Sequence, residues 1–306
     1  MSLMFEAGLQ WNEETLTDLL LAGSTPAIQV IPFPKRQEGG AGGTGADWLW
    51  WWIGDGGECF GMLVQAKRLK KRSTGAWWID FFYRDGAQQN ALLTTSQKWG
   101  VAPVYAVYTG PVDYRSPIEC GLSPHPKNLN ACSGCHRKSV SILPAILAAP
   151  GGIANDPAGL YEKTRALEEL LDPVGLDPDP WIIPLVDLSL TAEVAAFVCE
   201  PQGGPRAVAR LLLDPVLEVR YGQFSLATAN DLERRSDDLL YADLLDDQGH
   251  FVEPYFENIL RGLRRSPPGY VLDAMNGTMS PSQNLTGVAG LVVVHMSPTG
   301  DRPYGE

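Results

Sequence analysis

The sequence has no long hydrophobic run. No stretch of about 18 uncharged apolar residues, the length that a membrane-spanning helix needs, occurs in the 306-residue chain. The opening residues MSLMFEAGLQWNEE also lack the basic segment followed by an apolar segment that marks a secretory signal. We therefore expect a cytoplasmic protein that does not contact a membrane.

Cysteine and histidine are scarce. The chain has five cysteines and four histidines, and an odd cysteine count in a long chain argues against a disulfide scaffold. One cluster has zinc-like elements: Cys120, then Cys132 and Cys135 followed by His136, with His125 as a further candidate ligand. A second C-x₂-C pair is missing, and neighbouring residues do not readily share one tetrahedral site. Structural zinc is therefore an open hypothesis, and thiols without a metal are favoured.

Excess charge is confined to one half of the chain. Residues 1–140 contain 13 Lys and Arg against 12 Asp and Glu, whereas residues 141–306 contain 11 against 24. The basic cluster between Lys67 and Arg72 lies in the nearly neutral half. The net charge of −12 therefore does not exclude a nucleic-acid partner, because the local field decides such binding. The acidic half is interpreted as solvated helix faces. The alternatives are that it mimics or repels nucleic acid, or that it docks a protein partner or a second copy.

The first 110 residues show a regular series of predicted elements. Helices are expected at 11–23 and 86–100, and strands at 27–33, 47–54, 60–69, 77–83 and 102–110. The segment 77–83 fits either a fourth strand or the extension of a hairpin. This order predicts an α/β core within residues 1–150, with a cysteine-containing excursion at 111–140. Residues 151–306 are expected to form an acidic α+β extension.

Further elements are expected after residue 110. Helices are predicted at 140–149, 156–171, 236–247 and 253–265, and strands at 181–190, 194–200 and 290–296.

A glycine-rich loop precedes the strand at 47–54. Gly40, Gly42 and Gly45 form a literal G-x-G-x-x-G. A dinucleotide site needs this motif to open a helix, and here a strand follows. The pattern therefore favours a flexible loop. A serine hydrolase has little support, because no G-x-S-x-G motif occurs. A cysteine hydrolase built on Cys135 and His136 would need a base from elsewhere, and the chain has only four histidines.

Two polar residues interrupt the apolar strand GMLVQAKRL near its end. Gln65 and Lys67 are two positions apart, so both project to one face, while Val64 and Ala66 project to the other. Asp47 begins the preceding strand, and the turn GDGGE separates the two strands. If the strands pair antiparallel, the start of one meets the end of the other. Asp47 would then lie beside Gln65 and Lys67.

This trio has the chemistry of a metal site. Mg²⁺ prefers oxygen ligands and keeps several waters, so one carboxylate and one carbonyl oxygen can hold it. The ion activates a water and stabilises charge on a phosphate, and a neighbouring lysine can stabilise the developing charge. An aspartate before a strand is also a common turn residue, and a lysine at a strand end is normally solvated. Spacing alone leaves both interpretations open.

The order of elements and four motifs resemble a known superfamily. Asp47 on one strand and Gln65-x-Lys67 on the next are similar to the PD-(D/E)xK nucleases, whose restriction-endonuclease-like core has the order αβββαβ and a mixed sheet. More narrowly, ETLTDLLL, GADWLWWWIG, GMLVQAKRL and PVYAVY resemble an uncharacterised bacterial family of unknown function with the motifs E-[ST]-L-T-D, G-A-D-W-x-W-W, V-Q-A-K-x-L and P-x-Y-x-x-Y. The resemblance covers about residues 10–110.

The resemblance implies a site for Mg²⁺ or Mn²⁺. Asp47 and Gln65 would bind the ion together with the backbone carbonyl of Ala66, and Glu14, rather than Glu13, would assist from the first helix. Gln65 stands where the superfamily carries an acid. The site therefore loses one negative charge and is expected to bind Mg²⁺ more weakly.

The resemblance also implies the catalytic group and its partner. Lys67 would position the attacking water, and a helix glutamine, Gln88 with Gln89 as the alternative, would fix Lys67 or a phosphate. The basic residues that would contact the nucleic-acid backbone are Arg68, Lys70, Lys71 and Arg72.

Two functions follow from the sequence. The first is a magnesium-dependent nuclease that hydrolyses phosphodiester bonds of DNA, in defence against phage or mobile elements by analogy with the superfamily. The second is a catalytically inactive protein of the same fold that binds nucleic acid or another protein.

Overall fold

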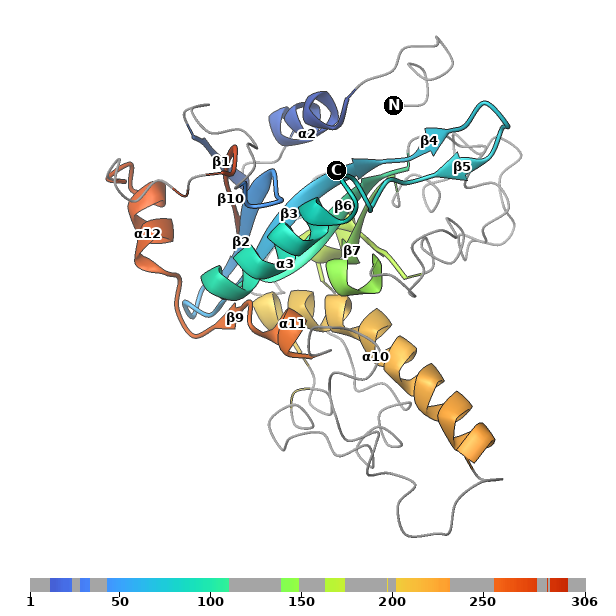
Figure 1. The fold of residues 1–306 in the computed structure, drawn as a ribbon. Coiled ribbons are helices and arrows are strands. Elements are labelled where there is room, and N and C mark those ends of the chain that lie inside the picture. Colours follow the sequence, from blue (N-terminus) through green and yellow to red (C-terminus); the bar gives the residue numbers. More distant parts are fainter. Residues whose placement is uncertain are drawn as a thin grey trace, which may run out of the picture.

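The computed structural model describes most of the core and parts of the second half (Figure 1). Its described residues are 12–23, 28–33, 43–109, 139–148, 163–173, 197, 202–231, 256–279, 285 and 287–296, with backbone only from 220 to 231. The helices and strands predicted at 181–190 and 236–247 lie outside them, as does the cysteine cluster at Cys120, Cys132 and Cys135.

The first helix, α2, is Glu13–Ala22. Asn12 caps it, because its side-chain oxygen accepts a hydrogen bond of 2.8 Å from the backbone N–H of Thr15. Glu13 and Glu14 occupy the first turn, where their negative charges interact favourably with the positive end of the helix dipole. The helix predicted at 11–23 is confirmed.

The fold is α/β with a mixed sheet. The sheet has the strand order β1-β10-β2-β3-β6-β7-β8, and β9 pairs with β3 outside this path. β10 pairs parallel with β2, and β3 pairs parallel with β6, whereas the remaining pairs are antiparallel. The strands are β1 (Ile28–Pro32), β2 (Trp48–Gly54), β3 (Cys59–Arg68), β6 (Ala102–Tyr108), β7 (Val140–Pro144), β8 (Arg165–Ala166), β9 (Leu263–Arg264) and β10 (Gly290–Met296).

A small hairpin continues from the end of β3. Its strands β4 (Lys70–Lys71) and β5 (Trp77–Trp78) pair antiparallel in a separate sheet. Figure 1 shows this hairpin projecting away from the main sheet. Trp77 and Trp78 thus belong to a hairpin, and residues 79–83 follow it without forming a strand of the core sheet.

The helices differ most from the sequence prediction after residue 139. The expected helix at 140–149 is wrong, since β7 and the 3₁₀ helix η2 (Ala145–Ala148) occupy this segment. The helix expected at 253–265 is reduced to α11 (Glu257–Leu260), which β9 follows. The long helix α10 (Gly204–Asp231) and the shorter α12 (Gly269–Met275) were not anticipated. The remaining helices are α3 (Ala87–Trp99) and α7 (Leu167–Leu171).

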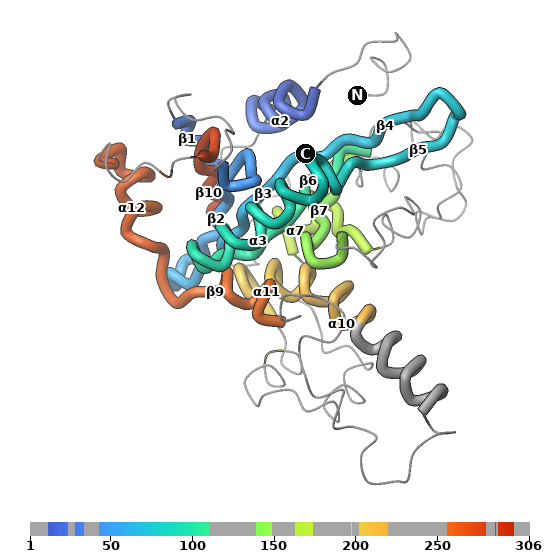
Figure 2. The backbone as a smooth tube through the Cα atoms, viewed as in Figure 1, coloured from blue at the N-terminus to red at the C-terminus, as the bar shows by residue number. Residues whose placement is uncertain are grey.

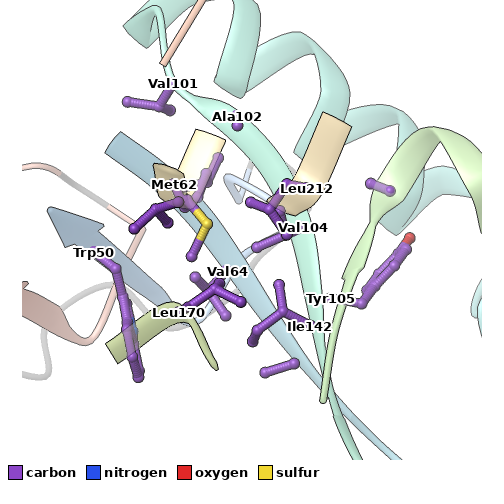
Figure 3. Packing of buried hydrophobic residues seen from close by; sticks show 14 of the residues in the cluster. Trp50, Met62, Val64, Val101, Ala102, Val104, Tyr105, Ile142, Leu170 and Leu212 are labelled. Atoms are coloured by element: carbon purple, nitrogen blue, oxygen red, sulfur yellow. The ribbon is translucent and has the colours of Figure 1, made fainter. Parts of the chain in front are cut away.

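The two faces of β3 have different partners. Met62 and Val64 project to an apolar face, where they pack with Leu212 of α10 and Leu170 of α7 (Figure 3). The alternate residues project to the face that α3 covers, because Gln88 of that helix bonds to Gln65. Strand alternation therefore places Gln65 and Lys67 on the face toward α3, opposite Met62 and Val64.

The last strand lies inside the sheet, one position from its edge. β10 lies between β1 and β2 and pairs with both. Figure 2 shows this late segment among the earliest strands of the chain. Residues 290–296, which we expected in a separate extension, therefore complete the core sheet.

Candidate functional site

Asp47 is anchored by backbone hydrogen bonds on both sides. Its N–H donates to the carbonyl of Val64 in β3 at 2.9 Å, and its carbonyl accepts from the N–H of Ala289 at 2.6 Å. The antiparallel pairing of β2 with β3 brings Trp48 opposite Val64. Asp47, one residue earlier, therefore reaches the polar end of β3, as the sequence predicted.

The side chains of Asp47, Gln65, Gln88 and Lys67 form one hydrogen-bonded chain. Gln65 Nε2 donates to Asp47 Oδ2 at 2.6 Å and to the carbonyl oxygen of Ala66 at 3.0 Å. Gln88 Nε2 donates to Gln65 Oε1 at 2.8 Å. Lys67 Nζ donates to Gln88 Oε1 at 2.5 Å. The N–H of Ala66 also donates to Asp47 Oδ2, at 2.7 Å. The structure thus brings all four side chains together.

Gly45 fixes the distance between Asp47 and the helix that carries Gln88. Gly45 has a φ of +73°, and a Cβ there would lie 2.4 Å from the carbonyl oxygen of Gln88 and 2.5 Å from the N–H nitrogen of Leu92. Only glycine allows the loop to touch the backbone of α3 in this way. The glycine-rich loop therefore has a structural role at Gly45 that the dinucleotide motif does not describe.

Gln88, rather than Gln89, is the helix glutamine of the site. Gln89 is buried elsewhere, where its side-chain nitrogen donates to the carbonyl of Ala145 at 3.2 Å. The two adjacent residues project to different sides of α3. Gln88, which the sequence favoured over Gln89, is thus the glutamine of α3 that bonds to Gln65 and Lys67.

Burial shifts the ionisation of both charged groups. Desolvation raises the pKa of Asp47 to about 6, although the hydrogen bond from Ala66 and the charge of Lys67 act in the opposite direction. Burial also lowers the pKa of Lys67, against the charges of Glu13, Asp80 and Asp47. Lys67 and Gln65 are each only 6% exposed. A lysine at a strand end is normally solvated, and this one is not.

Acidic residues surround the pair, and Glu13 acts more strongly on it than Glu14. The charge of Glu13 raises the pKa of Asp47 more than that of Glu14 does, and Glu13 also has the largest carboxylate effect on Lys67. Glu14 is exposed. The helix is held at this end because Thr17 Oγ1 and Tyr108 Oη lie 2.8 Å apart. The role given to Glu14 stays a prediction, and Glu13 has the larger electrostatic effect on Asp47 and Lys67.

Asp80 and Tyr83 were missed by the sequence analysis. Asp80 acts on Lys67 more strongly than Asp47 does. Lys67 Nζ lies 5.9 Å from the ring centroid of Tyr83, within the range of a cation–π contact. Both residues follow β5, where the chain returns toward the sheet. The acid inside the aromatic run WWIDFFY was the available signal.

Oxygen atoms suited to a hard cation converge beside Gln65. Asp47 Oδ2 and the carbonyl oxygen of Ala66 both accept a hydrogen bond from Gln65 Nε2. This nitrogen therefore lies between the two oxygens. A carboxylate, a backbone carbonyl and an amide oxygen are ligands that Mg²⁺ accepts. Within the described part of the chain, no group of three His, Cys, Asp or Glu side chains is placed to hold a metal. The oxygens of Asp47 and Ala66 are of the kind that such an ion accepts, whereas the oxygen of Gln65 faces Gln88 and its nitrogen lies between the other two.

The basic cluster lies on the projecting hairpin. Lys71 Nζ lies 4.9 Å from the ring centroid of Trp77, and Lys70 Nζ lies 5.5 Å from that of Trp78. Arg72 also lies over Trp78, at 5.2 Å. Lys70, Lys71 and Arg72 thus each lie over a tryptophan ring of the facing strand β5. Arg68 is different, because it lies 4.0 Å from the carboxylate of Glu13 near the site.

Cys59 is the cysteine that falls within the described residues, and it lies in the core. It is fully buried in β3, and burial raises the pKa of its thiol to about 11. Its buried, protonated thiol therefore packs as part of the core.

The described helices include none that is long and apolar enough to cross a membrane. The fold and the site together define an α/β protein whose candidate site lies at the start of β2 and the end of β3. It belongs to a family of unknown function, DUF6615, whose family model matches residues 1–171. Searches of curated proteins and of solved structures found no match.

Proposed function

We propose that this protein is a metal-dependent nuclease of the PD-(D/E)xK type. The observation that supports this most is the convergence of Asp47, Gln65 and Lys67 at the ends of adjacent strands, with Lys67 buried and bonded to Gln88. Burying a lysine costs stability, and such perturbed groups are concentrated at functional sites. The helix-strand order in residues 13–108 is consistent with a restriction-endonuclease-like core.

The site would hold Mg²⁺ or Mn²⁺ through Asp47, the carbonyl of Ala66 and the oxygen of Gln65. When bound, the ion supplies Lewis-acid stabilisation of a phosphate and an activated water. Lys67 adds a buried positive charge, which is worth more at a dry site than in water. Glu13 keeps this end of α2 acidic and acts on both Asp47 and Lys67.

The hairpin β4–β5 is the proposed contact with nucleic acid. Lys71 and Arg72 are exposed, and the hairpin leaves β3 directly after the site. Lys and Arg bind phosphates, and Trp77 and Trp78 offer rings on which bases can stack. A strand of DNA that lies along the hairpin would be directed toward the end of β3, where the candidate site begins. Defence against phage or mobile elements is the setting that the superfamily suggests.

A binding protein without catalysis is the second candidate. One observation favours it: Gln65 presents its nitrogen, and not an oxygen, to Asp47. The site as it stands is closed by hydrogen bonds. A protein that had lost the superfamily's acid could keep the hairpin and bind DNA without cleaving it.

A cleavage assay separates the two candidates. Single-stranded DNA, duplex DNA and RNA would be incubated with Mg²⁺ or Mn²⁺ and the wild type, Lys67→Ala or Lys98→Ala. Lys98 is exposed on α3 and serves as the matched control. We expect cleavage by the wild type and by Lys98→Ala, and a loss of about 100-fold or more in Lys67→Ala. Equal cleavage by all three proteins would refute the catalytic role, and DNA binding without cleavage would favour the second candidate.

A further inference from the structure

The hydrogen-bonded chain between Lys67 and Asp47 has a direction that both of its ends determine. The ammonium of Lys67 can only donate, so Gln88 must turn its oxygen toward it. The nitrogen of Gln88 then faces Gln65, whose oxygen accepts from it. The nitrogen of Gln65 is left for Asp47 Oδ2 and the carbonyl of Ala66, which can only accept. The donor Lys67 at one end and the acceptors Asp47 and Ala66 at the other therefore require the same orientation of both amides.

A cation beside Asp47 requires the opposite arrangement. The nitrogen of Gln65 lies between the two oxygens that would bind the ion, and a protonated nitrogen cannot be a ligand. If the amide of Gln65 turns over, its oxygen joins the carboxylate of Asp47 and the carbonyl of Ala66. Three acceptors at one point repel each other unless a cation lies among them. The turned amide is therefore stable only when the ion is bound.

The reversal of Gln65 extends to Lys67. Once turned, Gln65 presents its nitrogen to Gln88, which must then offer its oxygen in that direction. The nitrogen of Gln88 would face the ammonium of Lys67, and two donors cannot bond to each other. Lys67 loses its hydrogen-bond partner on α3.

We propose that Gln65 and Gln88 form an amide relay, in which cation binding beside Asp47 reverses both amides and releases Lys67 from Gln88. The relay rests on the metal site of the proposed function. It makes Lys67 available to a phosphate only when the ion is present. It also gives a reason for Gln65, because a carboxylate at that position would accept from Gln88 and bind the ion without any reversal.

Two measurements on the full-length protein test the relay. Calorimetric titration with Mg²⁺ reports ion binding. Reductive methylation with formaldehyde, followed by peptide mass spectrometry, reports how freely the Lys67 amine reacts. Lys98, exposed on the same helix as Gln88, is the internal reference. In the wild type we expect the labelling of Lys67 to rise about tenfold with Mg²⁺, as for the loss of one charge-assisted hydrogen bond, with no change at Lys98.

Three variants separate the relay from a simple opening of the site. Gln88→Met removes the relay, so Lys67 should label fast with or without Mg²⁺. Gln65→Glu should bind Mg²⁺ more tightly than the wild type, yet the labelling of Lys67 should stay slow in both conditions. Asp47→Asn should lose both Mg²⁺ binding and the response of Lys67. Circular dichroism spectra and melting curves identify any variant that fails to fold.

The outcomes distinguish the relay from the metal site. Binding of Mg²⁺ by the wild type without a change in Lys67 labelling would overturn the relay alone. A similar rise in Gln65→Glu would also overturn it, because no amide needs to reverse in that variant. Absence of Mg²⁺ binding in both the wild type and Gln65→Glu would overturn the metal site, and the relay with it.

Discussion

Burial of the Asp47 carboxylate carries a cost that its hydrogen bonds offset only in part. Ala66 and Gln65 donate to it, yet its pKa is still raised to about 6. A group that serves only the fold would be replaced easily by a neutral one. Retention of a charge in such surroundings is typical of functional sites, where stability is exchanged for activity.

The raised pKa of Asp47 predicts a pH-dependent gain in stability on neutralisation. Between pH 4 and pH 6 the folded protein binds a proton that the unfolded chain releases, so stability falls as the pH rises through this window. Asp47→Asn should therefore be more stable than the wild type at pH 8, by about 1–2 kcal/mol after allowance for partial exposure, and equally stable at pH 4. Urea unfolding at the two pH values measures this. The exposed Asp18→Asn is the control, and an equal gain in both variants would contradict the explanation.

Gly45 predicts a second effect at the residue scale. A methyl group at this position meets the backbone of α3 at 2.4 and 2.5 Å, and backbone atoms cannot rotate away as a side chain can. Gly45→Ala should cost about 2–4 kcal/mol of unfolding free energy. Gly75 also has a positive φ, +87°, but has open space around its Cβ position. Gly75→Ala should therefore cost only about 1–2 kcal/mol. Equal losses in denaturant titrations would show that the contact with α3 does not matter.

The core of the site was predictable from residue spacing, and its surroundings were not. Strand alternation and one antiparallel turn suffice to place Asp47 beside Gln65 and Lys67, because both rules act over short distances. Asp80 and Glu13 reach the site through the return of the hairpin and the docking of α2. Those are tertiary contacts, and no period in the sequence encodes them.

At the scale of elements, the hairpin β4–β5 stands apart from the sheet and presents its cations on its own surface. Lys71 and Arg72 are exposed, and each lies over a tryptophan ring. The sequence suggested a strand or a hairpin here because WWIDFFY is mostly aromatic and apolar, with Asp80 as its one charged residue. Trp77 and Trp78 pair with Lys71 and Lys70 and not with a strand of the main sheet, so they form a hairpin.

Removal of two hairpin cations should weaken DNA binding in a salt-dependent manner. Each phosphate contact contributes about 0.9 to the slope of log K against log salt. The double variant Lys71→Gln with Arg72→Gln should therefore lower this slope by about 2 units if both residues contact phosphates. Lys98→Gln with Arg265→Gln removes the same charge from exposed positions elsewhere. Fluorescence anisotropy across a salt series would measure both, and the same change in slope in the two variants would indicate a general charge effect.

Helix and strand assignments after residue 139 show where local patterns stop being decisive. VSILPAILA is apolar throughout, so its period cannot distinguish a helix from a buried strand. Contact with β6 makes its first part β7. The long α10 contains Pro215, which argues against an uninterrupted helix in any sequence-based prediction.

At the scale of the whole molecule, the matched family region does not contain the whole sheet. The family model ends at residue 171, but β10 lies between β1 and β2. Leu291, Val292 and Val293 of this strand are fully buried. The order of strands in a sheet depends on contacts between distant segments, so the sequence suggested a separate extension where the structure has an interior strand of the core sheet.

The position of β10 predicts that the core does not fold without the end of the chain. Its loss would remove hydrogen bonds to two neighbouring strands and expose several aliphatic side chains worth about 1.5–3 kcal/mol each. This sum is comparable with the total stability of a domain, about 5–15 kcal/mol. A chain that ends after residue 284 should therefore be unfolded, whereas one that ends after residue 298 should retain a cooperative transition. Circular dichroism melting curves compare the two, and a cooperative melt of the shorter chain would show that β1 and β2 can close the sheet directly. Because Asp47 is bonded to Ala289 just before β10, the shorter chain should also lose Mg²⁺ binding, which links the completed sheet to the candidate site.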